Sequence, residues 1–239
     1  MNKALIAIVP SAGLGKRFDA SGRKTFIKID GVPLLIYTLK RLHSENSIAE
    51  IIPVLRQEDI DMGFEMLKEY NLDKIKRIAP GGPERQDSIY NALRLIEEDG
   101  IDSYRNNYVL IHDGVRPYIP DGMIEKLVDE IKGVDGVIPG IPVKDTIKEI
   151  DSEGIVVSTL NRVKVRAVQT PQFFSFKVIK KAYDNAFKDG FYATDDAALV
   201  DRIGGKVRII AGSPLNIKVT TPEDIEIVEY LLKKEQYLS

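Results

Sequence analysis

Short apolar segments alternate with longer segments of helical period along most of the chain, and this alternation constrains the fold more than any other feature of the sequence. The apolar segments are rich in β-branched residues, and we predict strands at 4–9, 50–55, 76–79, 108–112, 136–138 and 206–210. Between them, apolar residues recur every three or four positions, which predicts helices at 57–70, 88–97 and 121–131. The pattern is typical of an α/β fold in which helices cover a mostly parallel sheet.

The stretch at about 142–165 departs from this alternation and predicts a protruding β-hairpin arm. Residues 146–150 and 155–160 flank a tight polar turn with the sequence D-S-E-G. A further amphipathic helix is predicted to begin after the cap residue Thr221. The sequence contains no repeat, low-complexity tract or flexible linker, so we expect a single domain over residues 1–239.

The charge composition and the rare residue types exclude several classes of function. With 34 Lys and Arg against 36 Asp and Glu, the net charge of −2 gives no global field that would attract nucleic acid or an anionic membrane, and we expect neither partner. The absence of cysteine and the presence of only two histidines exclude thiolate zinc sites and multi-histidine cages, so any metal should be a hard ion held by oxygen. No apolar run approaches the roughly 20 residues of a membrane span, and we expect a cytoplasmic protein.

Ligands of an open parallel sheet bind beyond the carboxyl ends of the strands, so the loops that follow the predicted strands form the candidate site. The first loop has the sequence P-S-A-G-L-G-K-R, in which small residues allow backbone N–H groups to approach a polyphosphate. Arg17 and the nearby Lys24 add cations. The loop matches neither the dinucleotide-binding nor the Walker pattern, and an ordinary strand-to-helix turn is the alternative interpretation. Its candidate nucleotide-binding residues are Pro10, Ser11, Ala12, Gly13 and Gly15.

The loop after the third predicted strand combines tight glycines with an arginine and a serine, which suit a base and a ribose. The residues concerned are Gly82, Arg85 and Ser88. A Gly-Pro turn with Asp87 or Ser88 as a helix cap is the alternative.

Two further loops carry charged residues at predicted strand ends. We expect Asp113 to hold Mg²⁺ and Arg116 to hold a substrate phosphate, with a mutual salt bridge as the alternative. The adjacent His112 is interpreted as a packed residue and not as a catalyst. Lys218 lies in an otherwise apolar strand and is expected to meet an anion, because a buried unpaired ammonium is costly; an ammonium that reaches solvent is the alternative.

Seven motifs, collinear and with matching spacing, resemble those of the methylerythritol phosphate cytidylyltransferase family. They are P-x-A-G-x-G-x-R with Lys24, G-G-x-x-R-x-x-S, H-D-x-x-R-P, P-V-x-D-T, T-P-Q-F-F, T-D-D-A and N-I-K-V-T. Together they cover nearly the whole chain. The resemblance implies a doubly wound Rossmann-like sheet with an arm that forms a homodimer. It also implies transfer of CMP from CTP to 2-C-methyl-D-erythritol 4-phosphate in non-mevalonate isoprenoid biosynthesis.

The same resemblance implies roles for individual residues. Arg17 and Lys24 contact the triphosphate and stabilise the transition state, and Lys218 is the third catalytic residue. The cytosine and the ribose are surrounded by Ser11, Ala12, Gly13, Gly82 and Ser88. The candidate nucleotide-binding set also includes Pro10, Gly15 and Arg85. The Mg²⁺ and the methylerythritol phosphate face Asp113, Arg116, Lys218 and Thr220. Two residues of the arm reach into the partner subunit's site, Thr146 and Arg162.

Several positions depart from the commonest family pattern and bear on substrate contacts more than on the reaction. They are Pro83, Gly114, Val115, Lys144 and Asn161. A ribitol-phosphate cytidylyltransferase shares most of the motifs and is the main rival to this interpretation. A hexose-1-phosphate nucleotidyltransferase is a second rival, and a non-catalytic CTP-binding protein is a third.

Overall fold

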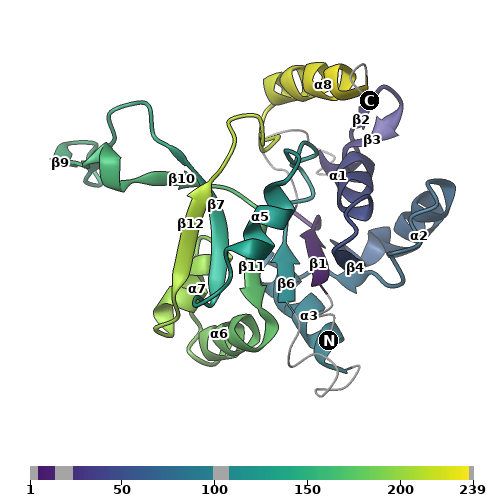
Figure 1. Ribbon diagram of the computed structural model, residues 1–239, viewed down its shortest axis with the longest axis horizontal. Coiled ribbons are helices and arrows are strands. Elements are labelled where there is room, and N and C mark those ends of the chain that lie inside the picture. Colours follow the sequence, from purple (N-terminus) through teal and green to yellow (C-terminus); the bar gives the residue numbers. More distant parts are fainter. Residues whose placement is uncertain (1–4, 14–23, 99–107, 237–239) are drawn as a thin grey trace.

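The computed structural model describes residues 5–13, 24–98 and 108–236 (Figure 1). Eight strands form the central sheet: β1 (Leu5–Pro10), β4 (Ile48–Leu55), β5 (Ala79–Pro80), β6 (Tyr108–Ile111), β7 (Gly136–Pro142), β10 (Arg166–Val168), β11 (Gln172–Ser175) and β12 (Val207–Ala211). Their order is β10-β7-β11-β6-β1-β4-β5, and β12 pairs with β7. Among the described strands of this sheet, only β10 and β11 run antiparallel to their neighbours, so the sheet is mostly parallel, as predicted.

Helices cover both faces of this sheet, as expected for a doubly wound fold. The described helices are α1 (Leu34–His43), α2 (Ile60–Glu69), α3 (Arg85–Glu98), α5 (Met123–Asp129), α6 (Phe176–Lys188), α7 (Asp196–Arg202) and α8 (Pro222–Gln236). One buried cluster joins the sheet to α1, α2 and α5, and a second joins it to α3, α6 and α7. The two clusters form the core on either side of the sheet.

The central strand β1 shows why these apolar segments become interior strands. Leu5, Ala7 and Val9 lie in the first cluster, whereas Ile6 and Ile8 lie in the second. Successive side chains of a strand point to opposite faces, so a strand covered on both faces needs apolar residues at consecutive positions. The uninterrupted apolar run of β1 is therefore a consequence of its central place in the sheet.

The helix α8 packs outside these two layers. Its Val228 and Leu232 form a third buried cluster with Leu34, at the start of α1, and with Val219. Short elements join this region: η1 (Lys24–Phe26) and the small hairpin of β2 (Lys28–Ile29) and β3 (Val32–Pro33). Packing of α8 fixes the segment before it, which contains Lys218.

The predicted hairpin arm is present and protrudes from the sheet (Figure 1). It consists of β8 (Lys148–Ile150) and β9 (Val156–Thr159), which pair antiparallel in a separate two-stranded sheet. In the turn, the Asp151 carboxylate accepts hydrogen bonds from the N–H groups of Glu153 and Ile155, both at 2.9 Å. Gly154 has a φ of +82°, which favours glycine at this position.

The six predicted strands of the sheet, the hairpin and the four predicted helices have counterparts in the structure. The short strand predicted around Lys218 is wrong, because residues 217–220 form no strand and belong to the loop before α8. The sequence pattern also does not predict α1, α6, α7, β2, β3, β10 or β11. The strand β11 has four residues and begins and ends with polar side chains, so it gives a weak strand signal. Its place between β6 and β7 is set by pairing with both neighbours. Among the described residues, no helix combines the length and the apolar character that crossing a membrane requires.

Candidate functional site

The candidate site lies where the neighbouring strands β6, β1 and β4 end. The register aligns Ile8 of β1 with Ile111 of β6 and Pro10 of β1 with Val54 of β4, so the loops after these strands leave the sheet at the same edge. The loop after β5 joins them, since its Gly81 N–H donates to the Leu55 carbonyl at 2.6 Å. The motif loops therefore meet as predicted for an open parallel sheet.

Glycines allow these loops to touch. A Cβ on Gly81 would lie 2.3 Å from the Ala12 Cβ, and a Cβ on Gly114 would lie 2.1 Å from the Ser11 Oγ. The loop after β1 is thus in contact both with the loop after β5 and with the loop after β6. Larger residues at these two glycines would push the loops apart.

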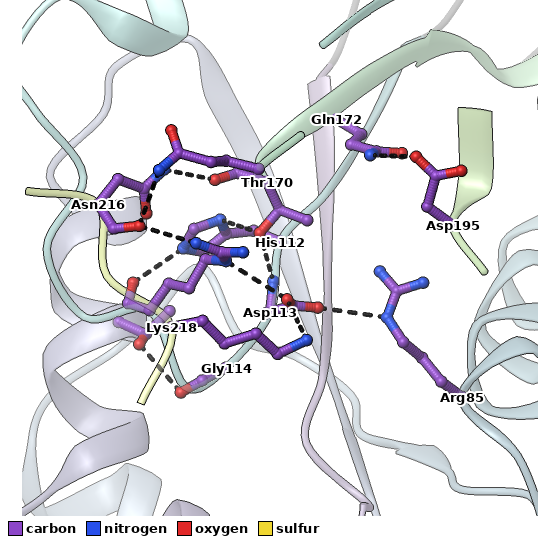
Figure 2. A network of polar contacts seen from close by, with 12 residues as sticks. Arg85, His112, Asp113, Gly114, Thr170, Gln172, Asp195, Asn216 and Lys218 are labelled. Carbon is purple, nitrogen blue, oxygen red and sulfur yellow. Dashed lines mark hydrogen bonds and ion pairs between the residues drawn. The ribbon is translucent and has the colours of Figure 1, made fainter. Parts of the chain in front are cut away.

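Asp113 is the centre of a cluster of three cations (Figure 2). Its buried carboxylate lies 2.9 Å from the Lys218 Nζ, 3.2 Å from the Arg85 Nε and 3.4 Å from the Arg116 Nε. Burial alone would raise the pKa of Asp113, but the charges of Arg85 and Lys218 hold it well below its usual range. Asp113 is therefore an anion that holds three cations at one place.

A buried network fixes the loop that carries Asp113. The His112 Nε2 lies 2.9 Å from the Arg116 carbonyl oxygen, and its Nδ1 lies 3.1 Å from the Thr170 Oγ1, which also accepts the Asp113 N–H at 3.1 Å. The carbonyl can only accept, so Nε2 carries the proton and the Thr170 hydroxyl donates to Nδ1. The Asn216 side chain donates to the Thr170 carbonyl at 2.7 Å, and the Asn216 carbonyl accepts from Arg116 Nη1 at 2.7 Å.

His112 is a neutral structural residue in this network. Its side chain is fully buried, and burial lowers its pKa to about 4. The interpretation of His112 as a packed residue is consistent with this geometry, because both ring nitrogens are engaged within the protein.

The loop that leads into α8 places Lys218 at the cluster. The N–H of Val219 donates to the Val115 carbonyl at 2.9 Å, which ties this loop to the loop after β6. Thr220 has a different arrangement: its N–H and hydroxyl both donate to Asp224, at 2.7 and 2.8 Å. Thr220 therefore stabilises the start of α8 in this structure, and its predicted contact with substrate stays a prediction.

The glycine loop after β5 is held by a serine. The Gly82 N–H donates to the Ser88 Oγ at 3.0 Å, and this hydroxyl donates to the Glu84 carbonyl at 3.1 Å. Ser88 is not the helix cap, because α3 begins at Arg85 and Ser88 lies within the helix. Its hydroxyl instead holds the loop on which Gly82 lies, and its predicted contact with the nucleotide stays a prediction. Asp87 caps the same turn by accepting the Glu84 N–H at 2.8 Å.

The charged cluster opens into a pocket of about 420 Å³. Its lining brings together parts of five motifs and comprises Arg85, Asp113, Arg116, Arg166, Val168, Gln169, Thr170, Gln172, Thr194, Asp195 and Lys218. Four of these side chains are cationic and two are carboxylates. The pocket therefore carries a positive charge of 4 − 2 = +2, which suits a phosphate monoester.

Several lining residues are not candidates on the sequence pattern alone. Arg166 and Gln169 lie beside the T-P-Q-F-F motif, and Thr194 and Asp195 belong to the T-D-D-A motif. The two motifs are evident in the sequence, but the roles of their residues depend on contacts between segments far apart in the chain. One example is the hydrogen bond from the Gln172 Nε2 to Asp195, at 2.9 Å.

The structure does not bring every predicted site residue into this pocket. Arg85, a predicted nucleotide-binding residue, does line the pocket, beside Asp113, and its predicted contact with the nucleotide stays a prediction. Thr146 and Arg162 lie on the arm, and Arg162 donates to the Lys144 carbonyl at 3.0 Å. Gly15, Arg17 and the side chain of Lys24 lie outside the described residues. Within residues 5–13, 24–98 and 108–236, there is no group of three or more His, Asp or Glu side chains suited to holding a metal.

The comparison with known families decides between the interpretations of these motifs. The family model for 2-C-methyl-D-erythritol 4-phosphate cytidylyltransferase matches residues 5–234. The chain belongs to this family. Similar curated proteins carry the same description: one from Syntrophus aciditrophicus is 39% identical and covers 99% of both chains, and one from Dictyoglomus thermophilum is 40% identical and covers 97% of this chain and 98% of its own.

Solved structures give the same result for the fold of this cytidylyltransferase family member. The 4-diphosphocytidyl-2C-methyl-D-erythritol synthase of Anaerococcus prevotii superposes with a TM-score of 0.82 at 32% identity and covers 97% of both chains. The 2-C-methyl-D-erythritol 4-phosphate cytidylyltransferase of Thermus thermophilus superposes with a TM-score of 0.74 at 26% identity and covers 95% of this chain and 98% of its own. The Rossmann-like sheet predicted for the chain is thereby confirmed.

Proposed function

We propose that this chain transfers CMP from CTP to 2-C-methyl-D-erythritol 4-phosphate, giving CDP-methylerythritol and pyrophosphate for isoprenoid biosynthesis. The observation that carries this proposal is the family match over residues 5–234, together with a cationic pocket at the strand ends that suits a phosphate monoester. A cytoplasmic location agrees with such a reaction and stays a prediction.

The reaction is an in-line displacement at phosphorus. An oxygen of the polyol phosphate attacks the α-phosphorus of CTP, a new P–O bond forms, and the bond to the α–β bridging oxygen breaks as pyrophosphate leaves. A phosphate monoester has a second pKa of about 6, so the nucleophile is largely a dianion at neutral pH and needs no general base. The engaged, neutral His112 is consistent with a mechanism of this kind.

The main catalytic problem is the repulsion between two anions. Lys218 and Arg116 lie together at Asp113, where they offer charge to the incoming phosphate. Asp113 holds these cations in place before the substrate binds, so little reorganisation is needed during the reaction. Arg17 and Lys24 are proposed to supply the corresponding charge to the triphosphate.

Magnesium is predicted at Asp113 from the sequence, but the carboxylate does not fit a metal ligand as the cluster stands. Both of its oxygens contact cations, and a divalent ion there would face Lys218, Arg85 and Arg116 at close range. Mg²⁺ commonly binds through substrate phosphates and retains several waters. We therefore propose that a magnesium ion would bind mainly through the triphosphate, and we assign it no step at Asp113.

We also propose that two subunits share each site through the arm. Ile155 and Val157 expose 62% and 63% of their surface, although a two-stranded hairpin is marginally stable unless it is covered. A second copy of the chain would cover these side chains and would bring Thr146 and Arg162 to a pocket on the other subunit. The proposed partner of this chain is therefore a second copy of itself, in a homodimer.

Pyrophosphate release tests the proposed reaction. We expect turnover only with both CTP and the methylerythritol phosphate, and much slower turnover with UTP, because a site that pairs with the 4-amino group of cytosine leaves polar groups unmatched by uracil. Binding of CTP without pyrophosphate release would instead support a non-catalytic CTP-binding protein.

A further inference from the structure

The T-D-D-A motif has two adjacent carboxylates with different environments. Asp195 caps α7 by accepting the Ala198 N–H at 3.0 Å. Asp196 takes no part in that cap, yet it is almost completely buried, with 1% of its surface exposed. A buried carboxylate is costly unless it is paired and hydrogen-bonded, so its partners indicate its purpose.

The partners of Asp196 come from two other helices. The Arg85 Nη1 and Nη2 donate to the two carboxylate oxygens at 3.1 and 2.9 Å, which is the two-pronged geometry that Arg forms best with a carboxylate. The buried hydroxyl of Tyr183, on α6, donates to the same carboxylate. Asp196 therefore fixes both the position and the plane of the Arg85 guanidinium.

The third nitrogen of that guanidinium points to the cluster already described. Its Nε donates to Asp113 at 3.2 Å (Figure 2). Arg85 therefore lies between Asp196 on α7 and the central carboxylate of the pocket. A third of the Arg85 side chain stays exposed, and the residue lines the pocket. An ion pair that served only to join helices would not need the contact with Asp113 or the place in the pocket wall.

The two carboxylates that hold Arg85, Asp196 and Asp113, also determine where the other cations lie around Asp113. If Asp196 did not hold Arg85, the guanidinium would be free to pair with both oxygens of Asp113, where Lys218 now binds at 2.9 Å. The neighbouring cations would then be redistributed around Asp113 before any substrate arrives. This redistribution of cations would change the phosphate pocket and not the loops after β1 and β5.

We propose that Asp196, assisted by Tyr183, is a positioning residue that holds Arg85 beside Asp113 so that the pocket presents ordered cations to the phosphate monoester. This inference rests on the proposed function, and it assigns Arg85 to the polyol phosphate and not to the nucleotide. Asp196 acts through Arg85 and has no contact with substrate.

The test compares the change in the Michaelis constant (KM) for the methylerythritol phosphate with the change in KM for CTP. Asp196→Asn and Arg85→Lys should each raise KM for the methylerythritol phosphate about tenfold, because each removes a charge-assisted paired contact, while KM for CTP changes less than about twofold. The double variant should be no worse than the single variants, because both remove the same interaction. Tyr183→Phe should give a smaller shift in the same direction and serves as the test if Asp196→Asn does not fold.

Glu50→Gln is the matched control. Glu50 forms a similar two-pronged pair with Arg77, at 2.8 and 3.3 Å, but it does not line the pocket. This change should lower thermal stability and leave both Michaelis constants unchanged. Equal rises in both constants for Asp196→Asn, or additive effects in the double variant, would overturn the proposal. Pyrophosphate release by the unaltered chain reports separately on the proposed function.

Discussion

At the scale of single residues, Lys218 makes the most direct connection between the cluster and the substrate. Its ammonium is the nearest to Asp113 of the three described cations in the cluster, and 43% of the side chain is exposed, so it is accessible to an incoming phosphate. We expect Lys218→Ala to raise KM for the polyol phosphate by about one to two orders of magnitude, since a hydrogen bond between charged groups is lost. Parallel measurement of both Michaelis constants checks this, and a larger effect on CTP would place Lys218 at the nucleotide.

A second residue-scale prediction concerns the contact between Ser11 and Gly114. A Cβ on residue 114 would lie 2.1 Å from the Ser11 Oγ and 3.3 Å from its Cβ, so Gly114→Ala forces the two loops apart. We expect a loss of about 1–3 kcal/mol in the free energy of unfolding. Ser11→Ala removes the clashing oxygen, and the double variant should recover most of this loss. Additive losses in urea denaturation would show that the two residues are independent.

The buried His112 gives a prediction for pH. Its pKa is about 4 in the fold, against the ordinary 6.5, so the unfolded chain binds a proton first as the pH falls. The contribution of neutral His112 to the free energy of unfolding is complete above about pH 6.5 and is lost progressively down to about pH 4. The free energy of unfolding should fall by an amount on the order of 2–3 kcal/mol between about pH 7 and pH 4.5. The variant His112→Gln should be less stable at neutral pH, but its free energy of unfolding should no longer fall with pH over this range. An unchanged slope in that variant would assign the pH dependence to other groups.

At the scale of elements, the sequence predicts most strands and helices because the pattern of β1 and its neighbours is local. A continuous apolar run indicates an interior parallel strand, and the D-S-E-G turn indicates a hairpin. The short strand β11 is different, since only its pairing with β6 and β7 makes it a strand. Elements that depend on their neighbours in this way are the ones that the pattern omits.

The candidate site shows the same division between local and long-range information. The loops after the strands could be predicted, because parallel strands bring their carboxyl ends to one edge. The pairing of Arg85 with Asp196 joins residues 111 positions apart, and that of Arg116 with the Asn216 carbonyl joins residues 100 apart. Contacts of this range follow from the folded sheet, which is why the sequence alone groups Arg85 with the nucleotide loop and not with Asp113.

The arm gives the element-scale prediction. Val157→Asp puts a charge on the exposed apolar ribbon, and burying that charge in a subunit interface would be costly. We expect the unaltered chain to have the mass of a dimer and the variant to dissociate, with Glu153→Gln in the exposed turn as the control that stays dimeric. Light scattering distinguishes the two masses. An unaltered chain that is monomeric at all concentrations would contradict the proposed homodimer.

At the scale of the whole molecule, a shared site can be tested by mixing two inactive variants. Lys24→Ala should disable the site in its own subunit, whereas Arg162→Ala should disable the site of the partner. In a mixed dimer both changes can fall in one site and leave the other intact, so roughly a quarter of all sites should regain activity after full exchange of subunits. Verified exchange without recovered activity would mean that Arg162 acts within its own subunit.

The identity of the phosphate acceptor tests the account most directly. The chain is given CTP with equal amounts of 2-C-methyl-D-erythritol 4-phosphate and ribitol 5-phosphate, and the two CDP-linked products are quantified by mass spectrometry. The family match predicts CDP-methylerythritol as the dominant product, in equal yield with pyrophosphate. Dominant CDP-ribitol, or pyrophosphate without either product, would contradict the proposed function.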